Sequence, residues 1–293
     1  MTSSHQEPTG FNVLERVRRT VRTSAARAGV ELVVVEEVEQ LREISALFAA
    51  VWGRSSEGVP MHSEAMRSMV HAGGMVNAAH DTTTGELLGA AVLGRDEPGA
   101  CYGYLAAAAP NAGDRGIGRT LKQHQRFWAL EHGLDVMRWT FDPLVARNAR
   151  FNISRLGAVV RAYEVAFYGH MADDLNGTDV GDRVVAQWDL RSSRALAAGE
   201  GVLPEHEIDP VRSAPAGAHV EDGPDGTPAL VVAGVDRWLR VPPDIVALRG
   251  HHPEQARAWR ASSANWMQEA FAAGLSVHAV SRTGWYHLQG ETA

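Results

Sequence analysis

The stretch "AAAPNAGDRGIGRTLK", residues 107–122, decides the fold class, because closely spaced glycines join an alanine-rich apolar run to a helical pattern. Glycine lets the backbone approach a ligand closely. The first amides of a helix point at one spot, where the helix dipole adds partial positive charge. The stretch therefore predicts a phosphate-binding turn, and its candidate binding residues are Gly116, Ile117, Gly118, Arg119 and Thr120.

Two other phosphate-binding patterns compete for the same turn. Residues 113–120 fit the nucleotide-triphosphatase pattern G-x-x-x-x-G-K-[ST], with Arg119 in place of the lysine. That reading is the weaker one, because a planar guanidinium does not replace the compact ammonium that reaches the terminal phosphates. A dinucleotide fingerprint fails because Leu121 stands where a third glycine is required.

The flanking sequence predicts an α/β fold with a mixed, largely antiparallel sheet flanked by helices. Strand-like runs around the turn-prone "TTTGE" are typical of an antiparallel meander, and apolar residues at helical spacing surround them. The expected strands cover 31–38, 75–81, 87–95, 101–109, 134–141, 158–168 and 183–190, and the expected helices cover 11–28, 41–51, 62–72, 117–132 and 145–156.

The glycine-rich stretch resembles the coenzyme-A-binding segment of the GNAT acyltransferases, L-A-V-x-P-x-x-R-G-x-G-I-G-x-x-L, with Pro110 at the proline position. The element order over 31–190 is similar to that of the GNAT fold. The motifs "WTFDPL", "NA-x-FN" and "LG" further resemble a branch of predicted acetyltransferases within that superfamily. The resemblance implies acetyl-CoA as cosubstrate and acyl transfer as the reaction.

The resemblance also assigns cofactor contacts. Pantetheine would lie between the strands 101–109 and 134–141, with Ala106 and Ala108 offering main-chain partners, and Asn148 is expected on the cofactor side of the next helix. Gly113 departs from the family pattern, which usually has Arg or Gln there. Arg115 is expected to supply the missing charge.

The usual catalytic residues of the family are displaced in this sequence. Its helix tyrosine maps to Ile153, and its strand glutamate maps near Tyr104, which stays a candidate. We expect Asp142 to be the acid–base residue, with a pKa raised by its aromatic neighbours. Its alternative role is to cap the turn at Pro143.

The leaving thiolate also needs a hydrogen-bond donor. Asn152 is expected to donate to the sulfur, because Asn148, Asn152 and Arg155 share one helix face. The alternative is an asparagine pair on the helix surface. Tyr163 and Tyr168 are alternative acids.

Composition limits the class of partner. The net charge of −7 gives no reason to expect nucleic acid or a membrane as partner. Cys101 is the only cysteine and the 13 histidines form no ligand motif, so we expect no metal site and a cytoplasmic location. No apolar run approaches the ~20 residues of a membrane helix. The oligomeric state stays open, with a homodimer as one candidate.

The chain is expected to divide into four parts. An N-terminal helical extension covers 1–30, the acyl-CoA-binding domain 31–190, a Gly- and Pro-rich linker 191–228, and a second, smaller α/β unit 229–293. The predicted function is direct acyl transfer from acetyl-CoA to a small-molecule amine. The alternative is a GNAT fold that binds acyl-CoA without transferring, as a sensor or partner module.

Overall fold

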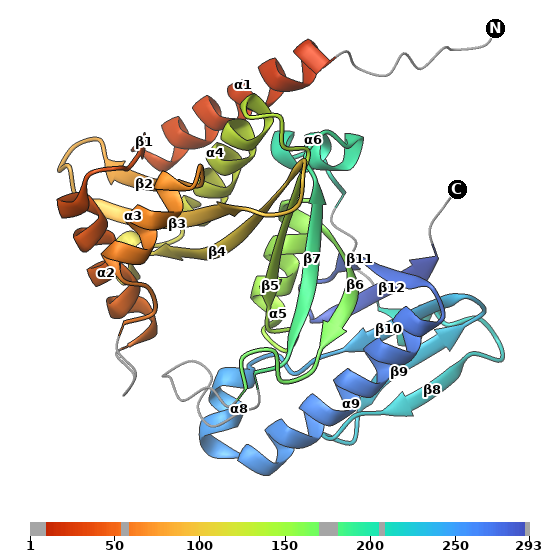
Figure 1. Ribbon diagram of the computed structural model, residues 1–293. Helices are drawn as coiled ribbons and strands as arrows, with labels where there is room; N and C mark the ends of the chain where they lie inside the picture. Colours follow the sequence, from red (N-terminus) through yellow and green to blue (C-terminus); the bar gives the residue numbers. More distant parts are fainter. Residues whose placement is uncertain (1–9, 54–58, 170–180, 205–208, 291–293) are drawn as a thin grey trace, which may run out of the picture. The chain divides into compact units, whose positions relative to one another are not determined.

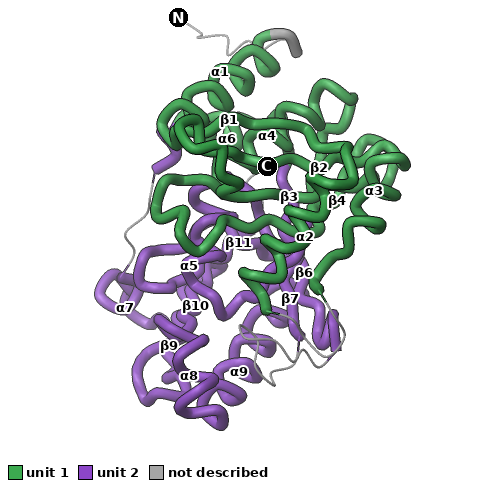
Figure 2. Tube along the Cα trace, turned by 90° about the vertical axis from the view of Figure 1, so that its left-hand side faces the viewer, with its two compact units in different colours: residues 1–137, 189–200 green, residues 138–188, 201–293 purple. Residues whose placement is uncertain are grey.

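The structure is a computed structural model that describes residues 10–53, 59–169, 181–204 and 209–290. Parts of the predicted N-terminal extension, linker and C-terminal unit (1–9, 205–208 and 291–293) therefore lie outside the described residues. Two compact units make up the chain (Figure 2). Unit 1 comprises 1–137 and 189–200, and unit 2 comprises 138–188 and 201–293.

Unit 1 is built on the predicted antiparallel meander. Its strands pair in the order β1-β2-β3-β4, each antiparallel to the next. The predicted strand at 31–38 is shorter than expected, because α2 already begins at Val38. The strands are β1 (Val30–Val34), β2 (Met75–Asp81), β3 (Leu87–Arg95) and β4 (Ala100–Ala108), and the helices are α1 (Gly10–Ala28), α2 (Val38–Trp52), α3 (Ser63–His71), η1 (Pro110–Ala112), α4 (Ile117–Glu131) and α6 (Ser193–Glu200).

Helices cover both faces of this meander (Figure 1). Leu41 and Ile44 of α2 and Met66 of α3 are buried in the same core as the alanines of β2 and β3. On the other face α4 lies directly on β3. A Cβ at Gly89 would come within 2.6 Å of Ile117 Cγ2, so only glycine permits this close approach.

The segment 189–200 returns to unit 1 and is fixed by a buried arginine. The guanidinium of Arg126, on α4, donates to the carbonyls of Leu190 (2.7 and 2.9 Å) and Ala195 (2.9 Å). Burial lowers the pKa of Arg126 to about 9. Its guanidinium nevertheless donates hydrogen bonds to the carbonyls of Leu190 and Ala195. The first part of the predicted linker is thus a packed helix, α6, with Ala195 and Leu196 buried.

Unit 2 is a second mixed layer of strands and helices. Its strands follow the order β5-β7-β6-β11-β12-β10-β9-β8, and β11 pairs with β6 at Val277 and Val160. The strands are β5 (Val136–Phe141, beginning in unit 1), β6 (Val159–Glu164), β7 (Arg183–Asp189), β8 (His219–Asp222), β9 (Pro228–Ala233), β10 (Asp236–Arg240), β11 (Leu275–Val280) and β12 (Trp285–Gly290). The helices are α5 (Ala146–Arg150), the π-helix η2 (Phe151–Arg155), α7 (Pro210–Ser213), α8 (Ile245–His251) and α9 (Pro253–Ala272).

The long helix α9 packs two tryptophans, seven residues apart, inward. Trp259 is 1% exposed and Trp266 is 6% exposed, and α9 contacts β6, β10 and β11. Both tryptophans therefore belong to the core of unit 2.

The fold class is confirmed: a mixed α/β protein with a largely antiparallel sheet flanked by helices. The compact units divide the chain at other positions than 190 and 229, so the four-part domain division stays a prediction. Along the described chain, no helix combines the length and the apolar composition that a membrane crossing requires.

Candidate functional site

The glycine turn, residues 113–120, has the backbone geometry of an open helix N-terminus. Gly113 and Gly116 have φ of 60° and 79°, and a Cβ built at either position would meet nothing within 4 Å. The first helical hydrogen bond runs from the Thr120 amide to the Gly116 carbonyl at 3.0 Å. The amides of Ile117 and Gly118 precede that bond, so no carbonyl of the helix accepts from them. The turn therefore combines two glycines in the left-handed conformation with amides at a helix N-terminus.

The guanidinium of Arg115 is directed into the protein. It binds the Asp81 carboxylate at 2.7 Å and donates to the carbonyls of Ala28 at 2.8 Å and Gly29 at 3.0 Å. The hydrogen bond from Arg115 is the main reason that the pKa of Asp81 falls to about 2. This placement contradicts the expectation that Arg115 supplies charge to a phosphate, because its nitrogens already serve three protein acceptors.

Arg119 and Thr120 also turn their side chains away from a ligand. Arg119 Nη2 donates to the carbonyls of Ala198 at 3.1 Å and Gly199 at 2.6 Å, near the C-terminal end of α6. The Thr120 hydroxyl donates to the Gly116 carbonyl at 3.1 Å, and Thr120 is buried. The side chains of both residues are thus engaged within the protein, so Arg119 does not take the place of a triphosphatase lysine. The assignment of Arg119 and Thr120 to the phosphate-binding turn stays a prediction.

The strand before the turn carries a β-bulge at Tyr104. Val92 of β3 pairs with Leu105, whereas the next residue, Leu93, pairs with Gly103, so Tyr104 has no direct partner on β3. Bulges redirect side chains and are common beside active sites. Tyr104 is 47% exposed, and its ring lies over Gly94, where a Cβ would be 2.7 Å from Tyr104 Cε2. Ala106 and Ala108 follow the bulge and are half-buried.

Asp142 is the centre of a buried ion cluster in unit 2. Arg260 donates to both carboxylate oxygens, at 2.8 and 3.0 Å, and Arg249 also donates to Oδ2. Oδ1 further accepts from the Leu144 amide at 2.9 Å. The Asp142 side chain is 7% exposed. The carboxylate is thus saturated with donors.

These contacts reverse the expected shift of the pKa. Burial by itself would raise the pKa of Asp142, but the charges and hydrogen bonds of Arg260 and Arg249 outweigh burial and lower the pKa to about 2. The expectation of a raised pKa is wrong, because the aromatic neighbours are not the nearest charges or dipoles. The acid–base role of Asp142 stays a prediction, and the geometry favours the turn-capping alternative.

Asn152 is buried in the π-helix η2 and is held by its neighbours. Its Oδ1 accepts from Trp139 Nε1 at 3.2 Å, and its Nδ2 donates to Asn148 Oδ1 at 3.3 Å. The two asparagines are hydrogen-bonded to each other, but they do not form a pair on the helix surface, because Asn148 is exposed and Asn152 is buried. The role of Asn152 as donor to the sulfur stays a prediction. The regular helix predicted over 145–156 ends at Arg150, and the wider π-turn follows. Such π-turns are frequent at functional sites.

The described residues place the candidates in different units. Tyr104, Ala106, Ala108 and the glycine turn belong to unit 1, whereas Asp142, Asn148 and Asn152 belong to unit 2. Tyr163 donates to Asp182 at 2.8 Å, and burial raises its pKa, so it is a poor proton donor at neutral pH. Within the part of the chain that the structure describes, no three potential metal-binding side chains gather.

Sequence reasoning missed Lys122, one helical turn after Gly118. It is the single lysine of the chain, it is buried on α4, and its Nζ lies 3.9 Å from Met137 Sδ. Burial lowers the pKa of Lys122 to about 8. The only signal in the sequence is a lone lysine among arginines, which does not show burial.

Comparison with known families identifies the domain that contains the glycine turn. Residues 12–143 match the family described as the acetyltransferase (GNAT) domain. This part of the chain is therefore similar to a GNAT acetyltransferase domain. The match begins within α1 and includes Tyr104, the glycine turn and Asp142, whereas Asn148 and Asn152 follow its end. No curated protein matches the sequence.

Solved acetyltransferase structures are similar to a little over half of this chain. The ribosomal-protein-S18-alanine N-acetyltransferase of Escherichia coli is 13% identical, with a TM-score of 0.45, over 56% of this chain and 96% of that chain. A Bacillus subtilis acetyltransferase in complex with CoA is 17% identical, with a TM-score of 0.43, over 55% and 98%. A phosphinothricin acetyltransferase from Sinorhizobium meliloti in complex with acetyl-CoA is 16% identical, with a TM-score of 0.44, over 54% and 87%.

Proposed function

We propose that the protein is an acyl-CoA-dependent N-acyltransferase, with acetyl-CoA as donor and a small-molecule amine as acceptor. The observation that carries the proposal is the glycine turn. It lies within the residues that match an acetyltransferase domain, and it combines two left-handed glycines with the open N-terminus of a 15-residue helix. This is a geometry that binds phosphate without basic side chains.

The pyrophosphate of coenzyme A would be held by main-chain groups. The amides of Ile117 and Gly118 and the dipole of α4 supply the positive end, and the space in front of Gly113 and Gly116 admits the phosphate oxygens. Arg115 and Arg119 are bound elsewhere, so they stabilise the turn and α6 rather than the ligand. Affinity for the cosubstrate then depends on backbone conformation more than on side-chain charge.

The reaction would proceed by direct transfer. The neutral amine attacks the thioester carbonyl, the C–N bond forms, the C–S bond breaks, and the amine proton is released as the thiolate is protonated. Tyr104 is the proposed proton-transfer residue in unit 1, because the bulge removes it from direct pairing with β3 and leaves its side chain half-exposed. Asn152 is the proposed donor near the sulfur.

A binding module without transfer is the second candidate. Two observations favour it: Asp142 is saturated by two arginines, and Ile153, which stands at the position of the family's tyrosine, is fully buried. Both leave fewer groups for proton transfer.

The two functions are separated by turnover. Acetyl-CoA is incubated with the protein and a panel of small amines, together with one peptide that has a free N-terminus; released thiol and acetylated product are measured by absorbance and mass spectrometry. The proposal predicts thiol release that requires one of the small amines. Acetylation of the peptide alone would contradict the small-molecule acceptor, and coenzyme A binding without any product would favour the binding module.

The role of Tyr104 is tested with a matched tyrosine on the same strand. Tyr104→Phe removes only the hydroxyl and is expected to lower kcat by ~10²-fold, the lower end for general acid–base catalysis. Tyr102→Phe is the control, since the two rings are neighbours at 5.1 Å. Equal kcat for both variants would remove Tyr104 from the chemistry and leave the acyl transfer itself untouched.

A further inference from the structure

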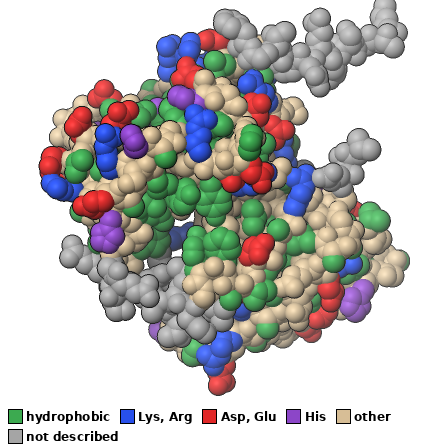
Figure 3. Space-filling view, in the orientation of Figure 1, with side chains coloured by type: hydrophobic (Ala, Val, Ile, Leu, Met, Phe, Trp, Pro, Cys, Tyr) green, Lys and Arg blue, Asp and Glu red, His purple; other side chains and the backbone are tan. Residues whose placement is uncertain are grey.

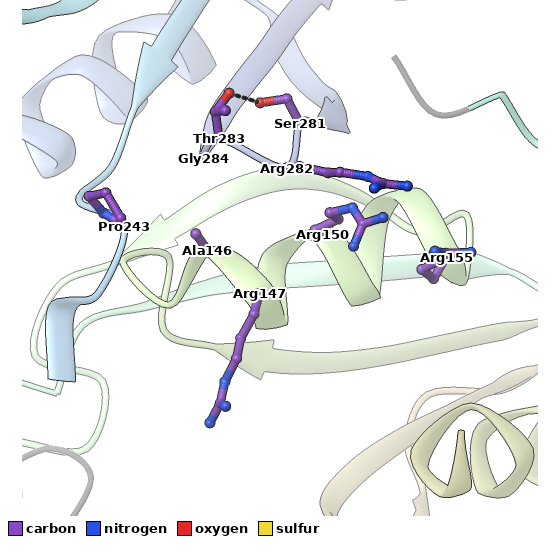
Figure 4. Close-up of a pocket in the computed structure, with 9 residues that line it drawn as sticks. All are labelled: Ala146, Arg147, Arg150, Arg155, Pro243, Ser281, Arg282, Thr283 and Gly284. Carbon is purple, nitrogen blue, oxygen red and sulfur yellow. Dashed lines mark hydrogen bonds between the residues drawn. The ribbon is translucent and has the colours of Figure 1, made fainter. Parts of the chain in front are cut away.

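Several arginine side chains in both units are bound within the protein. A pocket of about 640 Å³ in unit 2, between the helical segment α5–η2 and the β11–β12 turn, is lined by four arginines (Figure 4). Three of them, Arg150, Arg155 and Arg282, already interact with other groups of the protein, so their presence does not indicate a bound anion. An arginine engaged in this way acts on a ligand only through the backbone that it holds in place.

Arg119 is engaged with the last turn of α6, within unit 1. It is the third residue of α4, and its Nη2 donates to the carbonyls of Ala198 at 3.1 Å and Gly199 at 2.6 Å. Carbonyls in the last turn of a helix lack intrahelical donors and lie at the negative end of the helix dipole, so a guanidinium is a favourable partner for them. Arg119 therefore caps α6 and ties it to the first turn of α4.

The helix α6 is itself packed closely in unit 1. Leu196 is buried, and a Cβ at Gly199 would come within 3.1 Å of Arg126 Nη1, so α6 lies close to α4. The end of α6 is also paired with α1, because Arg16 donates to both carboxylate oxygens of Glu200, at 2.7 and 2.9 Å. The helix thus offers a fixed surface against which Arg119 holds the glycine turn.

The glycine turn is therefore anchored on both sides of its amides. Arg115 ties the turn to Asp81 before α4 begins, and Arg119 ties the first turn of α4 to α6. The residues Ile117 and Gly118 lie between these two anchors in the sequence. Their amides are the groups assigned to the pyrophosphate, so the orientation of these amides depends on both anchors.

Surface charge does not substitute for this geometry. On the molecular face seen in Figure 3, basic and acidic side chains are interspersed, and the chain carries a net charge of −7. The described residues on this face therefore present no concentrated positive field that would attract an anionic cosubstrate. The local orientation of the amides in the turn then matters more for affinity.

We propose that Arg119 is a positioning residue for coenzyme A and acts through α6. By holding the first turn of α4 against the end of α6, it keeps the amides of Ile117 and Gly118 directed at the pyrophosphate without touching the ligand. This inference rests on the proposed acyl-CoA site. It extends that site beyond the residues that match the acetyltransferase domain, since α6 begins at Ser193 and the match ends at residue 143.

Calorimetric titration with coenzyme A tests this role. Arg119→Gln replaces the guanidinium that binds the two α6 carbonyls, and it is expected to bind coenzyme A about tenfold more weakly. The matched control is Arg16→Gln, which removes the same charge from the same end of α6, but from α1 rather than α4. This control should bind as the wild type does, because an exposed ion pair contributes little.

The outcomes separate this inference from the proposed function. Equal coenzyme A affinity for the wild type and both variants would overturn the positioning role alone. A wild-type protein that does not bind coenzyme A would overturn the proposed function, and the positioning role with it.

A double-mutant cycle separates positioning from direct contact with the ligand. Leu196→Ala loosens α6 through a buried side chain and changes no charge. If Arg119 acts through α6, Leu196→Ala should also weaken coenzyme A binding, and adding it to Arg119→Gln should cause little further loss. Unchanged affinity in Leu196→Ala, or independent losses that multiply in the double variant, would place Arg119 on the ligand itself and overturn the inference.

Kinetics adds a readout that a purely structural role would not change. The KM for acetyl-CoA should rise about tenfold in Arg119→Gln, with kcat per folded molecule changed by less than about twofold. A smaller folded fraction would lower the amount of active enzyme and leave KM unchanged. That result would overturn the positioning role.

Discussion

The glycine turn of unit 1 and the Asp142 cluster of unit 2 both follow a strand end. They differ in how far their polar groups are already hydrogen-bonded within the protein. In the turn, the amides of Ile117 and Gly118 come before the first helical bond, and the space in front of Gly116 is open. In the cluster, one carboxylate receives donors from Arg249, Arg260 and the Leu144 amide, and it is almost completely buried.

The difference separates binding from structure. Donors at an open helix terminus gain a great deal when an anion arrives, because nothing in the helix competes for them. A buried carboxylate between two guanidinium groups has little left to offer a substrate, and removing it takes a shared anion away from two buried cations. We therefore assign ligand binding to the turn and a stabilising role to the Asp142 cluster.

Removing the charge of Asp142 tests the stabilising role of the cluster, and it is expected to have the largest effect. Asp142→Asn keeps the shape but leaves Arg249 and Arg260 buried without their anion, and it should lower the free energy of unfolding by about 3–5 kcal/mol. Chemical denaturation measures the change. The matched control is Glu39→Gln, which breaks the exposed Glu39–Arg42 pair. This control should change stability by only ~0–1 kcal/mol. Similar small losses for both variants would refute the stabilising role.

The pH dependence of unfolding tests the same stabilising role of Asp142. The folded pKa of Asp142 is about 2 and lies below its unfolded value, so its stabilisation is complete above the unfolded pKa of ~3.9 and is lost as the pH falls toward 2. The stability of the wild type should therefore fall more steeply over this window than that of Asp142→Asn. Denaturation curves from pH 5 to pH 2 give both slopes. Parallel slopes would mean that Asp142 does not carry the charge assigned to it.

A smaller effect is expected for Asn152. Asn152→Ala removes one acceptor from Trp139 and one donor to Asn148, so stability should fall by about 1–3 kcal/mol. If the amide also serves the leaving sulfur, kcat per folded molecule should drop by roughly tenfold or less, as for one neutral hydrogen bond. Measuring kcat and the denaturation midpoint on the same sample separates the two roles. Unchanged kcat with lowered stability would make Asn152 a structural residue only.

Much of the fold could be predicted because periodicity is local. The meander β2–β4, helix α4 and the core position of Trp259 and Trp266 all follow from spacing along the chain. The short elements α6, α7 and β8 escaped prediction because they lie in a Gly- and Pro-rich segment. The π-helix escaped it because an apolar helical stripe does not reveal a wider turn.

The site was predictable in its backbone but not in its side chains. Glycines mark the turn directly, whereas the directions of Arg115 and Arg119 depend on carbonyls at Ala28, Gly29 and near the end of α6, which are distant in sequence. The pKa of Asp142 depends on arginines 107 and 118 residues away. Side-chain electrostatics of this kind require the tertiary structure.

The most direct test of the central claim compares two glycines with the same conformation. Gly116 and Gly99 have φ of 79° and 78°, and both face open space. A valine at either position strains the left-handed backbone by ~1–2 kcal/mol, but only the one at 116 would fill the space assigned to the pyrophosphate. Calorimetric titration with coenzyme A should show at least about tenfold weaker binding for Gly116→Val and wild-type affinity for Gly99→Val. Equal coenzyme A affinity for the two folded variants would contradict the assignment of the turn as the cosubstrate site.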